Sequence, residues 1–149
     1  MRAVVQRVRS ASVRVENELV CEMGAGLLAL VGVGRDDTFE TAEELARRVV
    51  NLRVFEDDAG RMNLSLRETG GSLGVVSQFT LYGDARHGRR PSFVEACPKE
   101  RAGPIVDRLV EAARAHGVSV VSGRFQAMMD VSLVNAGPVT ILLDTDKRF

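Results

Sequence analysis

The chain has 149 residues, and we treat residues 1–149 as a single domain, because domains usually hold roughly 100–200 residues. Apolar residues make up 45% of the sequence and charged residues 27%, which excludes wholesale disorder, collagen-like repeats and coiled coils. The formal net charge is zero, which argues against a protein that coats nucleic acid nonspecifically. The longest weakly polar run, Gly24–Gly34, is shorter than the ~20 residues that span a bilayer. We therefore expect a cytoplasmic protein that does not contact membranes.

Metal-binding residues are sparse. The two cysteines, Cys21 and Cys97, stand far apart and form no CxxC pair, and His87 and His116 add no metal-ligand spacing. We therefore predict no metal and no cofactor.

The first thirty residues are typical of strands. Polar and apolar residues alternate over Ser12–Glu16, and Asn17-Glu18 separates this run from Leu19–Met23, which predicts a hairpin. Leu27–Val33 is wholly apolar and predicts a strand buried on both faces.

A helix is expected next. Asp37 is the predicted N-cap, with Glu40 three residues later completing a capping box. Apolar residues then follow at helical spacing on one face: Ala42, Leu45, Ala46 and Val49. Leu52–Phe55 should return to a strand, and the composition of Asp57–Gly60 predicts a turn.

The second half predicts one more long helix among strands. Ser72–Leu81 is expected to be a strand and Gly83–Pro91 a loop. Pro98 suits the first turn of a helix that would end near His116, with a kink or a start at Gly103-Pro104. The last predicted strands are Val118–Gly123, Met129–Val134 and Val139–Asp144. This pattern indicates an α/β fold with a mixed, largely antiparallel sheet and two main helices.

Ser77–Leu81 (SQFTL) places polar groups among apolar ones. As a strand it would put Ser77 and Phe79 on one face and Gln78 and Thr80 on the other. The segment is either an edge strand with one face in solvent or the wall of a pocket whose polar groups hold a ligand. Both alternatives give the Gln78 amide a partner, which a buried amide needs.

Two further segments leave alternatives open. Asn135–Thr140 (NAGPVT) is either a plain turn between strands or a rigid element built on a cis peptide bond at Gly137-Pro138, whose fixed carbonyls could read stereochemistry. Gly83–Pro91 contains three arginines, which are either solvated or in contact with phosphate.

SQFTL and NAGPVT resemble the two signature motifs of the D-aminoacyl-tRNA deacylases, formerly called D-tyrosyl-tRNA deacylases. The likeness covers essentially the whole chain, including Arg61–Leu64, Arg90–Phe93 and Val131–Leu133 in the same order. It implies an α/β fold with a barrel-like sheet. It also implies hydrolysis of the ester between a D-amino acid and the 3′ end of tRNA, with action on glycyl-tRNA, such as tRNA(Ala) mischarged with glycine, and rejection of L-aminoacyl-tRNA.

The resemblance also implies the site residues. The catalytic segment would be Ser77, Gln78, Phe79 and Thr80, and the substrate would further contact Phe125, Met129, Gly137 and Pro138. The family is homodimeric, with active sites at the subunit interface and a Gly-cisPro dipeptide inserted into the partner's pocket. It requires no metal.

This sequence departs from the family's pattern near those motifs, with Gln126, Met128 and Ala136 in place of the residues expected there. The mechanism stays open between an acyl-Thr80 intermediate and attack by water assisted by the terminal 2′-hydroxyl of the RNA. A different class of function is an RNA- or nucleotide-binding module that has kept the fold without hydrolysis.

Overall fold

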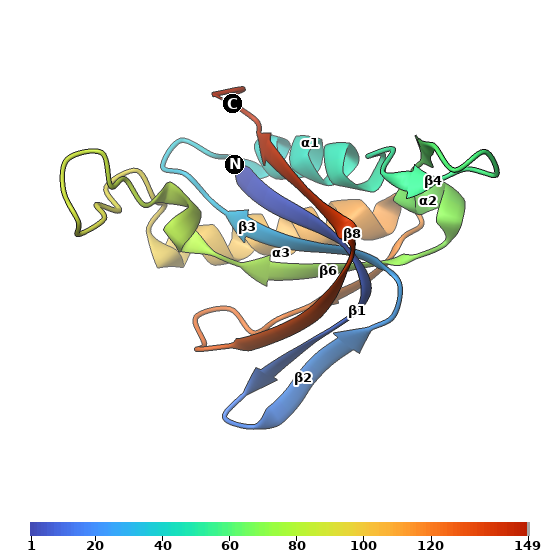
Figure 1. The fold of residues 1–149 in the computed structure, drawn as a ribbon. Helices are drawn as coiled ribbons and strands as arrows, with labels where there is room; N and C mark the ends of the chain where they lie inside the picture. Colours follow the sequence, from blue (N-terminus) through green and yellow to red (C-terminus); the bar gives the residue numbers. More distant parts are fainter. Residues whose placement is uncertain (149) are drawn as a thin grey trace.

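In the computed structural model, which describes residues 1–148, the long N-terminal strand organises a curved mixed sheet (Figure 1). The strands are β1 (Arg2–Val15), β2 (Glu18–Met23), β3 (Gly26–Gly32), β4 (Phe55–Glu56), β5 (Met62–Leu64), β6 (Ser72–Ser77), β7 (Ser119–Ser122) and β8 (Asp130–Asp144). One edge of β1 pairs antiparallel with β8, and the other pairs antiparallel with β3 and then β2. The sheet continues from β3 through the parallel strands β6 and β7.

The helices are α1 (Phe39–Val50), α2 (Leu66–Thr69), α3 (Lys99–Ala115) and the short 3₁₀ turn η1 (Phe79–Tyr82). The two long helices, α1 and α3, lie side by side against one face of the sheet (Figure 1). Their apolar faces and the inward residues of β1, β3 and β6 form the main core. The predicted α/β class, with a mixed, largely antiparallel sheet and two main helices, is confirmed.

The N-cap of α1 differs from the prediction. Thr38, not Asp37, caps the helix, and Thr41 completes the capping box in place of Glu40. Asp37 is instead buried, where it accepts hydrogen bonds from the Met1 ammonium and the Gly34 N–H. The local sequence pattern therefore did not determine the N-cap, because Asp37 instead contacts residues elsewhere in the chain.

Gly103-Pro104 does not begin α3, since the helix runs from Lys99 to Ala115 and contains both residues. Pro104 lies on the exposed side of the helix, so the Glu100 carbonyl that it leaves unpaired can bind water. Gly103 is buried, and a Cβ there would lie 3.2 Å from Cε1 of Phe125. The glycine thus permits the Phe125 ring to lie close against α3.

Several strand boundaries also differ. The first hairpin turns at Glu16 and Asn17, both with positive φ, one residue earlier than predicted. Only Phe55 of the predicted strand Leu52–Phe55 lies in a strand, and it begins the small β4–β5 hairpin around the predicted turn Asp57–Gly60. The two predicted C-terminal strands are one continuous strand, β8. Within residues 1–148, no helix is both long and apolar enough to cross a membrane.

Candidate active site

Strand β6 ends at Ser77, where the sequence predicted a strand as far as Leu81. The Gln78 N–H still donates to the Val31 carbonyl at 2.7 Å, and the chain then turns into η1. The predicted alternation of faces beyond Ser77 is therefore wrong. Gly32 allows this turn, because a Cβ there would lie 3.1 Å from the Gln78 carbonyl oxygen and 3.2 Å from the Tyr82 ring.

The turn places unpaired donors beside hydroxyl and amide groups. The first N–H groups of a helical turn have no partner within it, and no acceptor within residues 1–148 is recorded for the N–H of Phe79 or Thr80. The Gln78 side-chain amide donates to the Thr80 hydroxyl. Two N–H donors and one hydroxyl thus stand next to each other at the end of β6.

These groups line a cavity of about 650 Å³ between the carboxyl end of β6, α3 and the segment after β7. It brings together six of the predicted site residues: Ser77, Gln78, Phe79, Thr80, Phe125 and Met129. The other wall is apolar, from Val31 and Val33 of the β3 end and Ala102 and Val106 of α3. Polar donors at one side and apolar side chains at the other suit an aromatic ring linked to a polar group.

Two titratable residues of the cavity were not predicted from the sequence. Cys97 and Lys99 lie at the start of α3, and neither has a motif spacing to Ser77–Thr80. Burial raises the pKa of the Cys97 thiol, so the neutral form is favoured. Lys99 brings the cavity a positive charge. Gln126, one of the departures from the family pattern, also lines the cavity and has a φ of 61°.

A buried polar network holds η1 from behind. The Tyr82 hydroxyl donates to Asp37 at 3.3 Å, and Asp37 also forms an ion pair with the Met1 ammonium at 2.6 Å. Arg2 donates to the Leu81 carbonyl at 3.0 Å, pairs with buried Asp144 and lies over the Tyr82 ring. Burial, followed by the negative charge of Asp37, raises the pKa of the Tyr82 hydroxyl, so Tyr82 stays a neutral donor.

The second motif forms a bulge in β8. Thr140 and Asn135 pair with Gln6 and Val8, so four residues of β8 lie opposite the single residue Arg7 of β1. The bulge contains the exposed dipeptide Gly137-Pro138, whose peptide bond is cis. The segment is therefore neither a turn between strands nor regular strand.

Side chains on both strands brace this bulge. Arg7 donates to the Ala136 carbonyl at 2.9 Å and to the Val54 carbonyl at 2.6 Å. The Asn135 amide accepts from the Val139 N–H and donates to the Val139 carbonyl. Gly137 has a φ of 144°, and a Cβ there would lie 2.9 Å from the Val139 nitrogen. Only glycine fits this backbone without displacement.

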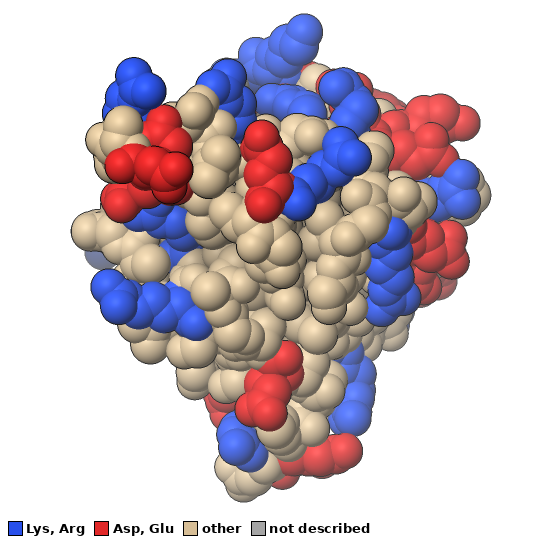
Figure 2. All heavy atoms as spheres, turned by 90° about the vertical axis from the view of Figure 1, so that its right-hand side faces the viewer, with Lys and Arg blue, Asp and Glu red and all other residues tan. Residues whose placement is uncertain are grey.

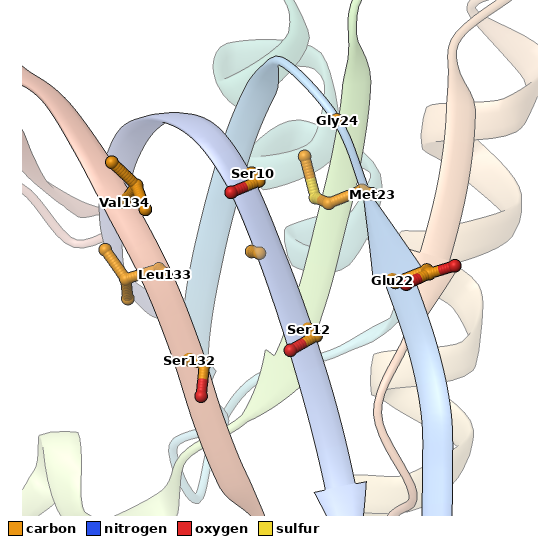
Figure 3. A pocket seen from close by; sticks show the side chains of 9 residues that line it. Ser10, Ser12, Glu22, Met23, Gly24, Ser132, Leu133 and Val134 are labelled. Atoms are coloured by element: carbon orange, nitrogen blue, oxygen red, sulfur yellow. The ribbon is translucent and has the colours of Figure 1, made fainter.

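Within one chain the two motifs do not meet. The cavity is not lined by Gly137 or Pro138, and β8 and β6 are three strand steps apart, roughly 14 Å at the usual spacing. A second hollow, of about 570 Å³, lies over β1, β2 and β8 and exposes Ser10, Ser12 and Ser132 (Figure 3). It contains none of the predicted site residues, so the cavity beside η1 is the candidate site.

The amino-acid sequence matches a known protein family. The family model described as D-Tyr-tRNA(Tyr) deacylase matches residues 4–144. The chain is 55% identical to the D-aminoacyl-tRNA deacylase of Thermotoga petrophila over the full length of both chains. It is 58% identical to that of Thermomicrobium roseum, over 97% of this chain and 94% of the relative.

Solved structures share the fold. A c-Myc DNA Unwinding Element Binding Protein superimposes with a TM-score of 0.91 at 38% identity, covering 97% of this chain and 99% of that one. A probable eukaryotic D-amino acid tRNA deacylase superimposes with a TM-score of 0.83 at 20% identity, over 95% of this chain and 97% of that one. The full-length identity to named deacylases and the family model together show that the chain belongs to the D-Tyr-tRNA(Tyr) deacylase family.

Proposed function

We propose that this enzyme hydrolyses the ester that joins a D-amino acid to the 3′ end of tRNA, releasing the free amino acid and tRNA. Membership of the family supports the reaction class. The observation that carries the proposal is one cavity lined both by Phe79 and Thr80, whose N–H groups have no acceptor within residues 1–148, and by apolar Phe125 and Met129. The apolar wall suits the terminal adenine, and the two donors suit the ester carbonyl. Because tRNA is the substrate, the proposal includes a cytoplasmic location.

The favoured mechanism uses the RNA as well as the protein. Water attacks the ester carbonyl carbon, the carbon–O3′ bond breaks, and the proton of the water passes to the leaving 3′ oxygen. The N–H groups of Phe79 and Thr80 would stabilise the tetrahedral oxyanion, an effect worth about 10²–10³ in rate for each donor. The terminal 2′-hydroxyl would assist the attacking water.

An acyl-Thr80 route is the alternative, and the cavity supports it less well. A threonine hydroxyl needs a base to become a nucleophile, whereas the neighbour of Thr80 is the Gln78 amide, a donor. Among the described residues that line the cavity, only Cys97 and Lys99 have titratable side chains. Thr80→Ala should therefore keep measurable turnover, and a 2′-deoxy substrate should be inert. A trapped acyl-Thr80 adduct would reverse this choice.

The bulge of β8 supports a role in chiral discrimination. Main-chain carbonyls at Gly137 and Pro138 can contact only the atoms that all aminoacyl groups share, which allows broad tolerance of the side chain. An L side chain would point toward the dipeptide and clash, whereas a D side chain would point outward. Glycine has no side chain to clash. We therefore expect cleavage of D-aminoacyl-tRNA and glycyl-tRNA, and negligible cleavage of L-aminoacyl-tRNA.

This role requires two chains. Because Gly137 and Pro138 do not line the cavity of their own chain, a two-fold homodimer would have to bring the dipeptide of one protomer to the site of its partner. Exposed Val134 and Leu142 on either side of the dipeptide offer apolar surface for such an interface. Sedimentation should find a dimer at working concentration, and a fully active monomer would refute the arrangement.

The deciding experiment is incubation with three substrates: D-aminoacyl-tRNA, L-aminoacyl-tRNA and glycyl-tRNA. Release of D-amino acid and glycine, with L-aminoacyl-tRNA intact, supports the proposal. The relative named for binding a DNA element motivates the second candidate, a nucleic-acid-binding module without hydrolysis. Tight binding of D-aminoacyl-tRNA without release of amino acid would favour that candidate.

A further inference from the structure

Two aromatic side chains stand exposed at the rim of the cavity. The rings of Phe79 and Phe93 pack edge to face, with centroids 5.1 Å apart and an angle of 64° between their planes. Phe79 is 59% exposed and Phe93 is 38% exposed, and the next residue, Val94, is 61% exposed. Burying such rings is favourable, so this pair is an apolar surface that lacks a partner within the described chain.

The pair lies at the foot of the arginine-rich loop. Asp84 and Ser92 exchange two backbone hydrogen bonds of 2.8 Å, which close the loop 85–91 directly before Phe93. A Cβ at Gly83 would lie 3.0 Å from Cε1 of Phe93, so the loop base and the ring are in contact. The loop projects from the body beyond η1, at the left of Figure 1.

The loop carries uncompensated positive charge. Arg86 is paired with Asp84 through 2.7 and 2.9 Å hydrogen bonds, which hold the pKa of the Asp84 carboxyl below its ordinary value. Arg89 and Arg90 are exposed, and no acidic partner within residues 1–148 is recorded for either. On the opposite end of the molecule, by contrast, Lys and Arg side chains lie among Asp and Glu side chains around an uncharged centre (Figure 2).

Exposed aromatic rings flanked by arginines are the combination that binds single-stranded nucleic acid. Bases stack on the rings, and arginines contact the backbone phosphates. Phe79 both lines the cavity and touches Phe93, so the pair continues the cavity toward the loop. A strand whose last nucleoside occupies the cavity would pass over Phe93 and then reach Arg89 and Arg90.

We propose that Phe79 and Phe93 stack the base of the nucleotide that precedes the terminal adenosine, and that Arg89 and Arg90 contact the adjoining phosphates. The inference rests on the proposed function, since it extends the same RNA end outward from the cavity. It assigns the loop a binding role that gives full-length substrates an advantage over a bare adenosine ester.

Three esters of one D-amino acid separate the steps: those of adenosine, of the dinucleotide cytidylyl-adenosine and of full-length tRNA. Phe93→Ala should lower kcat/KM by about tenfold more on the dinucleotide and tRNA esters than on the adenosine ester, because a stacked base is lost. Phe93→Trp should restore the advantage. Phe39→Ala removes another exposed ring, which does not line the cavity, and serves as the control.

The charge contribution is tested with the double variant Arg89→Ala/Arg90→Ala. It should raise KM for tRNA more than for the adenosine ester. It should also reduce the slope of log(kcat/KM) against log salt concentration by about 1.4 on tRNA, because each of two phosphate contacts to a single strand contributes about 0.7. Arg47→Ala/Arg67→Ala is the matched control, since it removes two exposed arginines from α1 and α2.

The outcomes distinguish this inference from the proposed function. A wild-type protein that cleaves none of the three esters contradicts the function itself. Equal losses on all three esters, or no losses, overturn the inference while the function stands. A shift of Phe93→Ala toward the monomer would assign the aromatic pair to the subunit interface and would also overturn it.

Discussion

The two motif segments interrupt the sheet in different ways. Strand β6 stops at Ser77, and the chain turns into η1, where Phe79 and Thr80 line the cavity and their N–H groups have no acceptor within residues 1–148. At Asn135–Val139 the strand β8 continues, but a bulge leaves the dipeptide Gly137-Pro138 exposed. Residues of η1 thus have unpaired backbone donors, whereas Pro138 of the bulge has no N–H and can offer only its carbonyl, an acceptor.

The two segments are also held differently. A buried ionic network behind η1 joins Tyr82, Asp37 and the Met1 ammonium. The bulge is held by hydrogen bonds from half-buried Arg7 and from Asn135. Substitutions in the buried network behind η1 should therefore lower the free energy of unfolding of the whole protein. Substitutions that remove the hydrogen bonds of the bulge should mainly lower activity.

Asp37→Asn should give the largest effect, a loss of about 3 kcal/mol in the free energy of unfolding. It leaves the buried Met1 ammonium without its counter-charge, and breaking one partner of a buried pair costs several kcal/mol. Denaturant unfolding measures the loss. Asp36→Asn, at an exposed neighbour, is the control, and equal stability of both variants would show that the network is not the support of η1.

Gly137→Ala should leave the fold intact and lower kcat/KM on D-aminoacyl-tRNA by about a hundredfold. The new Cβ would lie 2.7–2.9 Å from Val139 in a backbone with φ of 144°, so the dipeptide must shift, and a shift of about 1 Å suffices for such a loss. Ala136→Asp should change little. Near wild-type activity of Gly137→Ala would mean that the dipeptide takes no part in the reaction.

The same contrast explains what the sequence could predict. The long helices α1 and α3 and the first strands follow from hydrophobic periodicity, because each buries one continuous face. The end of β6 and the bulge of β8 do not follow from hydrophobic periodicity. The end of β6 at Ser77 depends on Gly32 of the neighbouring strand, which lets Gln78 and Tyr82 approach.

The sequence pointed to the two segments but not to their arrangement. SQFTL stood out for polar groups among apolar ones and NAGPVT for its Gly-Pro peptide, yet the register of β8 on β1, which creates the bulge, depends on long-range pairing. Lys99 and Cys97 join the cavity only because α3 starts beside it. Asp37 was predicted as an N-cap from its neighbours in sequence. Its actual partner, the Met1 ammonium, lies 36 residues away, which a local pattern does not reveal.

Arg7→Lys should lower kcat/KM on D-aminoacyl-tRNA by about tenfold without a matching loss of stability. The guanidinium donates to two carbonyls on different segments, Ala136 and Val54, and a lysine ammonium lacks the fork that reaches both. Arg9→Lys, at an exposed position of the same strand, is the control. Equal activity of both variants would show that the bulge keeps its position without Arg7.

Tyr82→Phe should have the smallest effect, a loss of about 1 kcal/mol near neutral pH, because one hydrogen bond to Asp37 is removed and the ring is kept. The effect depends on pH with a definite sign. The pKa of Tyr82 is raised in the native state, so above about pH 10 the unfolded chain loses a proton that the native protein keeps. Wild-type stability should therefore fall as pH rises in that range.

The variant lacks this group, so its stability should fall less steeply above pH 10, and the gap between the two proteins should narrow. Tyr82 is the only tyrosine of the chain, so the near-ultraviolet absorbance of tyrosinate reports its ionisation without interference. In the native protein that signal should appear only on alkaline unfolding. Tyrosinate absorbance that develops near pH 10 while the protein stays folded would mean that the hydroxyl is not held by Asp37, and that η1 depends on Arg2 and backbone contacts instead.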